Sequence, residues 1–254
     1  MKKLLLASLL VSGPTLAAGS GVVGSTADIP ASHHADDSSG WQVSLGAGAV
    51  NAPEFDGVDD TETNAVPLIK VNYNHRFYIE FNKIGWWAWK PDDTGFSLGL
   101  VAQSRKGYDK GDGPIPNFEV DDTALAGIRA RWINGRFAIH GAVLGSSESD
   151  SGGEAHITAS YTFIASPKGT LSAMVQAETL SEDAVDYFYY AETDAGADSA
   201  TNLSLGVIGT YNFSKKWTMI GGVKVTSLDD PISDAPGVTE DSSTKAVLGL
   251  MYNF

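Results

Sequence analysis

Apolar and polar residues alternate along this chain from residue 41 to its last residue. The alternation is strictest in the last ten residues, where every second side chain is apolar: Ala246, Leu248, Leu250, Tyr252 and Phe254. A period of two is typical of a β-strand with two different faces. Chain ends usually fray, so a strand that keeps its pattern to the final residue is expected to be paired along both edges.

The same pattern predicts about twelve strands. Most of them are 9 to 12 residues long, close to the length that a tilted strand needs to cross a bilayer. The predicted strands cover residues 41–50, 65–73, 76–81, 85–90, 95–103, 123–133, 136–144, 154–164, 170–179, 202–213, 217–226 and 245–254.

The connections between these strands alternate in length. Tight turns are predicted near residues 74–75, 91–93, 134–135, 166–169 and 214–216, and Asn134-Gly135 is a strong hairpin signal. Long loops are predicted at 51–63, 105–122, 146–154, 181–201 and 229–244, and the exception is a tight turn near residues 83–85. Short turns on one side and long loops on the other are typical of outer-membrane barrels.

Charge follows the same division. The chain has 254 residues and a net charge of −14, and the five long loops hold 24 of its 31 acidic residues. Lysine, arginine and histidine gather instead at the tight turns and nearby strand ends. A soluble β-sandwich also alternates but has no reason to sort its loops by side. The sequence therefore predicts an all-β fold, a transmembrane antiparallel up-and-down barrel of about twelve strands, with ten as the alternative count.

The first residues have the features of a secretory signal peptide. Lys2 and Lys3 precede a short apolar run, and cleavage is expected after Ala17 or Gly19. We therefore expect a signal peptide over 1–19, a flexible periplasmic tail over 20–40 and the barrel over 41–254. His33 and His34 in the tail could bind a metal weakly, but a solvated tail is the favoured interpretation. The acidic charge argues against nucleic-acid binding.

Several segments, in this order, resemble the MipA/OmpV family of outer-membrane proteins. They are "SLGAGAV" and "PEFDG" (44–57), "VPLIKVNYNHRFYIE" (66–80), "DYFYYAETDA" (186–195), "NLSLGVIGTYNFSKKWTMIGGV" (202–223), "LDDP" (228–231) and the ending "MYNF". The resemblance implies a monomeric barrel in a Gram-negative outer membrane, in contact with its lipids and lipopolysaccharide. It also implies a non-enzymatic scaffold for a lytic transglycosylase and a penicillin-binding protein, with no cofactor. Adhesion, stress response and solute uptake are the alternatives within the family.

Charged and polar residues of the inward rows are the candidate site residues. A small-solute channel could use them as a selective constriction, but a paired structural network that fills a narrow barrel is the favoured interpretation. These candidate lumen residues are Glu80, Arg129, Arg131, Arg136, His140, Glu178 and Lys224. His140 and Ser160 could lie close together on adjacent strands, but no strained nucleophile turn accompanies them, so catalysis is not expected.

Two further groups have membrane or ion-binding interpretations. Leu248, Leu250, Tyr252 and Phe254 are expected to close the barrel, and the terminal Phe also resembles the signal read by the outer-membrane assembly machinery. Trp86, Trp87 and Trp89 are predicted to form an interface belt rather than a sugar platform. The acidic loops could hold a divalent cation, but solvated loops are the simpler interpretation, and no metal site is predicted.

Overall fold

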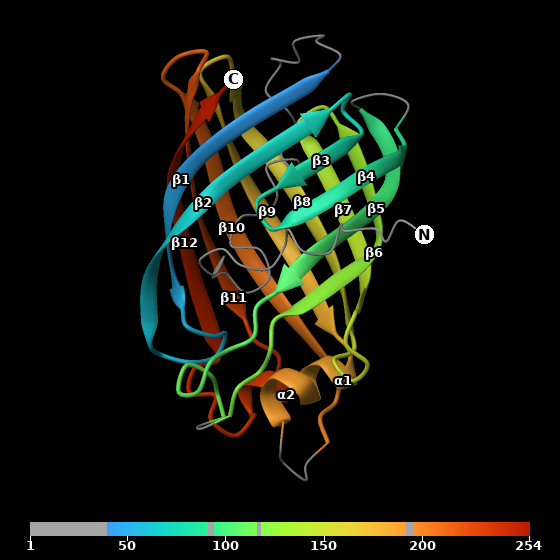
Figure 1. Cartoon of the computed structure of the whole chain (residues 1–254), viewed down its shortest axis with the longest axis vertical. Coiled ribbons are helices and arrows are strands. Elements are labelled where there is room, and N and C mark those ends of the chain that lie inside the picture. Colours follow the sequence, from blue (N-terminus) through green and yellow to red (C-terminus); the bar gives the residue numbers. More distant parts are fainter. Residues whose placement is uncertain (1–39, 91–93, 116–117, 192–195) are drawn as a thin grey trace, which may run out of the picture.

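A computed structural model describes residues 40–90, 94–115, 118–191 and 196–254, and the expected signal peptide and most of the expected tail lie outside these residues. Twelve antiparallel strands form one barrel (Figure 1). They are β1 Trp41–Pro53, β2 Thr61–Tyr73, β3 Phe77–Glu80, β4 Lys83–Trp89, β5 Gly95–Arg105, β6 Thr123–Asn134, β7 Phe137–Ser146, β8 Gly153–Ser166, β9 Gly169–Leu180, β10 Ala200–Asn212, β11 Trp217–Ser227 and β12 Ser242–Asn253.

The barrel is closed by the last strand, as the alternation predicted. β12 pairs with β11 on one side and with β1 on the other, so that Leu248 lies opposite Gly221 and Ala49, and Leu250 opposite Met219 and Ala47. Beyond β12, the Phe254 amide donates to the Val43 carbonyl (3.0 Å). Closure gives every strand a neighbour on both sides, and it leaves one local open edge beside the short strand β3. The predicted fold and the count of twelve strands are confirmed.

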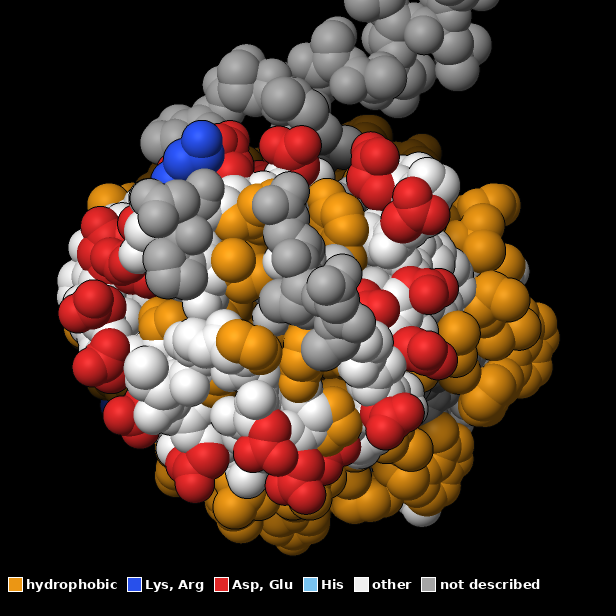
Figure 2. Space-filling view, turned by 90° about the horizontal axis from the view of Figure 1, so that it is seen from below, with side chains coloured by type: hydrophobic (Ala, Val, Ile, Leu, Met, Phe, Trp, Pro, Cys, Tyr) orange, Lys and Arg blue, Asp and Glu red, His pale blue; other side chains and the backbone are white. Residues whose placement is uncertain are grey.

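The two ends of the barrel differ as the loop lengths predicted. Connections at 74–76, 90–94, 135–136, 167–168 and 213–216 are short and lie with the chain's C-terminus at one end, here called the turn end (Figure 1). Connections at 54–60, 106–122, 147–152, 181–199 and 228–241 are longer and lie at the other, the loop end. Acidic side chains surround the loop end in Figure 2.

The outward face of the barrel is apolar, with exposed aromatic side chains close to the turn end. The prediction that Trp86, Trp87 and Trp89 share this belt is wrong for one of them. Trp86 and Trp89 are about half exposed, whereas Trp87 is only 4% exposed and faces the interior. The β4–β5 register shifts between Trp87 and Trp89, and this bulge lets residues three apart share the outer face.

The shortest strand of the barrel is β3, which has four residues and pairs with residues 70–73 of β2. The β3–β4 turn lies at residues 81–82, slightly earlier than predicted, and the Phe81 amide donates to the Ile69 carbonyl (2.9 Å). Residues 61–68 of β2 therefore pair with β1 alone. Pro67 has its nitrogen on the same side as Ile69, toward this open edge, where a missing N–H costs no ladder hydrogen bond.

The interior has an apolar side and a polar side. Strands β1, β2 and β10–β12 contribute the apolar cluster Val50, Val66, Leu68, Ile208, Ile220, Val247 and Met251. Most of the buried charged side chains lie on strands β3 to β9. None of the helices in the described ranges is long and apolar enough to cross a membrane.

Candidate functional site

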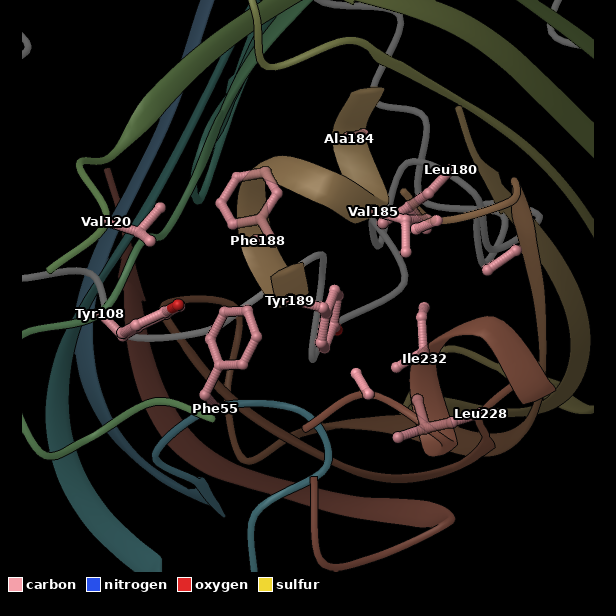
Figure 3. Close-up of a cluster of buried hydrophobic side chains, with 13 residues drawn as sticks. Phe55, Tyr108, Val120, Leu180, Ala184, Val185, Phe188, Tyr189, Leu228 and Ile232 are labelled. Carbon is pink, nitrogen blue, oxygen red and sulfur yellow. The ribbon is translucent and has the colours of Figure 1, made fainter. Parts of the chain in front are cut away.

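Loops at the loop end fold together into a buried apolar cluster, here called the loop cap (Figure 3). Its centre is aromatic: the Phe55 ring lies 4.9 Å from the Tyr108 ring and 5.3 Å from the Tyr189 ring. Four loops and the adjoining strand ends contribute its members, which are Phe55, Tyr108, Val120, Leu180, Ala184, Val185, Phe188, Tyr189, Ala197, Ala200, Leu228, Ile232 and Ala235. The loops therefore cover this end of the barrel as a packed unit.

Short helical segments position the aromatic residues of the cap. Helix α1 (Glu182–Val185) begins at Ser181, whose hydroxyl accepts from the Ala184 amide. A π-helical turn (Asp186–Tyr190) follows and buries both Phe188 and Tyr189. Helix α2 (Asp230–Ser233) buries Ile232, and the Tyr190 hydroxyl donates to the Pro231 carbonyl (2.9 Å). This hydrogen bond joins the π-helical turn to helix α2 at the loop end of the barrel.

An ion pair ties the β1–β2 loop to the barrel wall. Lys245 Nζ of β12 donates to Asp56 Oδ2 at 2.8 Å, and the Ser243 hydroxyl donates to Asp56 Oδ1 at 2.7 Å. Burial by itself would raise the pKa of Asp56, but the Lys245 charge and the two hydrogen bonds outweigh it and hold the pKa at about 2. Asp56 therefore remains a carboxylate at neutral pH.

A second polar contact joins the cap to the opposite wall. Arg105 Nη1 donates to Glu154 Oε2 at 2.7 Å, and Gln103 Nε2 donates to Glu154 Oε1 at 2.6 Å. The Arg105 guanidinium also lies over the Phe188 ring, 4.6 Å from its centroid. Arg105 thus contacts both the wall and the cap.

Six of the seven candidate lumen residues lie buried in the interior. The structure places them on five strands, as Glu80, Arg129, Arg131, His140, Glu178 and Lys224. Arg136 does not join them: it lies exposed in the β6–β7 turn, and its Nη1 donates to the Phe163 carbonyl at 3.0 Å. Strand β7 begins at Phe137, so the alternation of inward and outward side chains does not extend to Arg136 in the turn before it.

The two interior arginines of β6 stack on aromatic side chains of the β3–β4 hairpin. Arg129 and Arg131 lie 5.0 and 4.6 Å from the centroid of the Trp87 ring. Arg129 Nη1 also donates to the Tyr78 hydroxyl at 2.8 Å. Glu80 forms an ion pair with Lys70 at 3.6 Å. His140 lies opposite Thr158 and Ser160 lies opposite Ala138, so His140 and Ser160 are diagonal neighbours on β7 and β8.

Sequence reasoning did not identify the residues that hold the cap. Strand parity could have found Arg105 and Glu154, because they share the inward rows of Gln103 and His156. Asp56 lies in an acidic loop with no periodic signal, so its contact with Lys245 was not predictable. Within the described ranges, no three His, Asp or Glu side chains are grouped to hold a metal ion.

The turn end carries basic side chains on its connections. Two aspartates of the sequence, Asp92 and Asp93, also belong to these connections, and they are outnumbered by the basic residues. The basic residues there are His75, Arg76, Lys90, Arg136, Lys168, Lys215 and Lys216. The two ends of the barrel therefore have opposite charge.

Comparisons with solved structures return outer-membrane barrels at low identity. An outer-membrane channel from Pseudomonas putida F1 is 12% identical with a TM-score of 0.49, covering 85% of this chain and 96% of that one. The NanC porin is 10% identical with a TM-score of 0.46, covering 84% and 100%. OmpT of Vibrio cholerae is 10% identical with a TM-score of 0.40, covering 84% and 97%. A comparison with curated proteins gives no match.

A family model is matched by nearly the whole described barrel. The match covers residues 45–254, from the first strand to the last residue, and the model is described as MltA-interacting protein MipA. The chain is an outer-membrane barrel protein and belongs to the MipA family.

Proposed function

We propose that this barrel is a non-enzymatic anchor, monomeric in the outer membrane, on which a lytic transglycosylase of the MltA type docks from the periplasm. The observation that carries the proposal is the difference between the two ends of the barrel. The loop end is covered by a packed cap held by two buried polar contacts, and the turn end presents exposed basic residues. The family description names an interaction with MltA, which supports the choice of partner.

The orientation follows from the way outer-membrane barrels are built. Their short turns face the periplasm and their long loops face outward. In this orientation the turn end is the side that a murein enzyme can reach. A penicillin-binding protein in the same complex would extend the scaffold role that the family resemblance implies.

The short turns set the kind of contact that is available. A specific interface usually buries more than about 1,000 Å² in total, and five short turns offer little shape for it. Charge complementarity is the stronger contribution here, because Lys168 and Lys215 are exposed at the tips of two hairpins. We therefore expect an acidic patch on the partner and a marked dependence of its association rate on salt.

A small-solute channel is the second candidate, and the basic interior favours it. Arg129 and Arg131 could select anions by charge. Conductance in planar bilayers separates the two functions. Stable steps that change in Arg129→Ala or Arg131→Ala would favour the channel, and their absence would favour the anchor.

The anchor is tested by binding of the organism's own lytic transglycosylase to the barrel in nanodiscs. We expect Lys168→Glu with Lys215→Glu to weaken binding at least tenfold. Glu148→Lys with Asp150→Lys, in the exposed β7–β8 loop of the other end, is the matched control and should bind like the wild type. Equal binding by both double variants, or no binding by the wild type, would overturn the proposal.

A further inference from the structure

Three of the basic residues at the turn end contact neighbouring strands of the barrel wall. We infer that Arg76, Arg136 and Lys216, here called the belt cations, form a binding belt for the phosphate groups of anionic phospholipids in the adjacent leaflet. The inference does not rest on the proposed function, because it concerns the lipid-facing side of the barrel and not its periplasmic partner.

Each belt cation reaches sideways from its turn across a neighbouring strand. Arg76, in the β2–β3 turn, donates from Nη1 to the Ala88 carbonyl of β4 at 3.1 Å. Arg136, in the β6–β7 turn, donates to the Phe163 carbonyl of β8 at 3.0 Å. Lys216, in the β10–β11 turn, lies over the Tyr252 ring of β12, 5.6 Å from its centroid. These contacts fix the cations beside the wall instead of letting them extend away from it.

Exposed aromatic rings lie next to each belt cation. Ala88 is flanked by Trp89, and Phe163 stacks edge-on with Tyr161 at 5.5 Å. Tyr252 lies between Trp217 and Phe254, at 5.1 and 5.0 Å. Exposed Trp and Tyr side chains mark the level of the lipid headgroups. A cation held just beyond them therefore lies at the level of the phosphates.

The charges remaining at the turn end favour an anionic ligand. In the sequence, the turn-end connections hold six lysines and arginines against two aspartates, Asp92 and Asp93, so their net charge is positive. The hydrogen bond with Tyr252 raises the pKa of Lys216, so this side chain is fully charged at neutral pH. Arg76 uses Nη1 on the Trp87 and Ala88 carbonyls and Arg136 uses Nη1 on the Phe163 carbonyl, and a guanidinium has further N–H donors that can reach a phosphate oxygen.

The ligand class follows from the position of the belt. A basic residue near an anionic membrane surface attracts its lipids by an amount that corresponds to about fivefold enrichment per cation. The belt lies against the bilayer on the outside of the wall, whereas the carboxylates of murein lie further into the periplasm. We therefore assign the belt to phospholipid phosphates and expect selectivity for phosphatidylglycerol over phosphatidylcholine.

Quenching of tryptophan fluorescence by brominated lipids tests this assignment. Five of the six tryptophans, Trp41, Trp86, Trp89, Trp132 and Trp217, are exposed on the outer face, so they report on the lipids around the barrel. The protein is reconstituted into phosphatidylcholine vesicles that contain the same small fraction of either brominated phosphatidylglycerol or brominated phosphatidylcholine. We expect stronger quenching by the brominated phosphatidylglycerol, and we expect salt to reduce the difference.

Matched variants locate the effect. Arg76→Gln with Lys216→Gln should remove most of the excess quenching, and adding Arg136→Gln should remove the rest. Lys168→Gln with Lys215→Gln changes the net charge by the same amount at the hairpin tips and should keep the excess. Equal quenching by the two lipids in the wild type would overturn the inference. So would equal losses in the two double variants, or displacement of the lipid by soluble murein fragments.

Discussion

Lys245 Nζ lies 2.8 Å from Asp56 Oδ2, and this contact joins residues 189 positions apart in the chain. Lys245 is near the start of the strand that closes the barrel, and Asp56 is in the first long loop. The ammonium is 3% exposed and the carboxylate 16%. One ion pair thus links the strand that closes the barrel wall to a loop that contributes to the loop cap.

Removing the Asp56 charge is expected to loosen the loop cap. Asp56→Asn keeps the size of the side chain but leaves the buried Lys245 ammonium without its counter-charge. Losing one partner of a buried pair costs about 3 kcal/mol, so we expect the cap to open far more often. Hydrogen exchange of residues 54–60 should speed up by about two orders of magnitude. Ser243→Ala removes only a hydrogen bond, about 1 kcal/mol, and serves as the graded control.

The same pair sets the pH range over which the cap stays closed. Asp56 has a pKa of about 2 in the folded protein and an ordinary value of 3.8, so its contribution is fully present above about pH 4. It is lost as the pH falls from about 4 toward 2. Exchange of residues 54–60, corrected for intrinsic rates, should stay constant between neutral pH and about pH 4 and then rise as the pH falls further. Opening at about pH 6 that persists in Asp56→Asn would show that another group controls the cap.

Phe188 is expected to be the main packing residue of the cap. It is 1% exposed, and it contacts both the Phe55 ring and the Arg105 guanidinium. Phe188→Ala should destabilise the cap by about 3–5 kcal/mol and expose residues 182–190 to exchange and proteolysis. Tyr187→Ala, at the half-exposed edge of the same turn, should cost much less. Similar losses in both variants would mean that the turn and not the packing holds the cap.

A substitution at Tyr108 is expected to stabilise the cap, unlike the substitutions at Asp56 and Phe188. Its ring is buried in the cap, and its hydroxyl has no hydrogen-bond partner among the described residues. Burial raises the pKa of Tyr108 to about 12, so the hydroxyl keeps its proton. Tyr108→Phe removes a desolvated polar group and should stabilise the cap by up to about 1 kcal/mol. Faster exchange of residues 106–110 in this variant would contradict the packing we describe.

Deleting Phe254 distinguishes between two roles of this residue, an assembly signal and a structural contact. The residue is 79% exposed, its backbone amide donates to the Val43 carbonyl, and its ring touches the barrel only at Tyr252 among the described contacts. Deleting Phe254 should leave the thermal stability of barrel refolded in detergent within a few degrees of the wild type. In cells the same deletion should lower the amount of barrel in the outer membrane severalfold, as expected if the terminal Phe is an assembly signal. A large loss of stability in the refolded variant would instead assign Phe254 a structural role.

The barrel was predictable because the features that specify it repeat regularly along the sequence. Alternation fixes which side chains face lipid and which face the interior, so residues such as Arg129 and Lys224 could be placed from their parity alone. The sorting of loop lengths predicted the two ends of the barrel, and the terminal row predicted closure between β12 and β1. Alternation gave the wrong side for two residues. Trp87 faces the interior next to a bulge, and Arg136 lies in a turn outside strand β7.

The loop cap was not predictable, because its contacts have no period. Phe55, Tyr108, Phe188 and Ile232 come from four separate loops, and only their folding together makes a cluster. The aromatic run in residues 187–190 contributed only to the family resemblance, because its composition fits a surface belt as well as a buried cluster. The direction of Arg76, Arg136 and Lys216 along the wall also depends on turn geometry that charge alone does not specify.

Photocrosslinking in intact cells tests the anchor most directly. A photoreactive residue is placed at Lys168 or Lys215 at the turn end, and at Asp150 at the loop end, and the crosslinked proteins are identified after outer-membrane isolation. The anchor predicts crosslinks to a lytic transglycosylase from the two turn-end positions and none from Asp150. Absence of any murein enzyme from the turn-end crosslinks would contradict it.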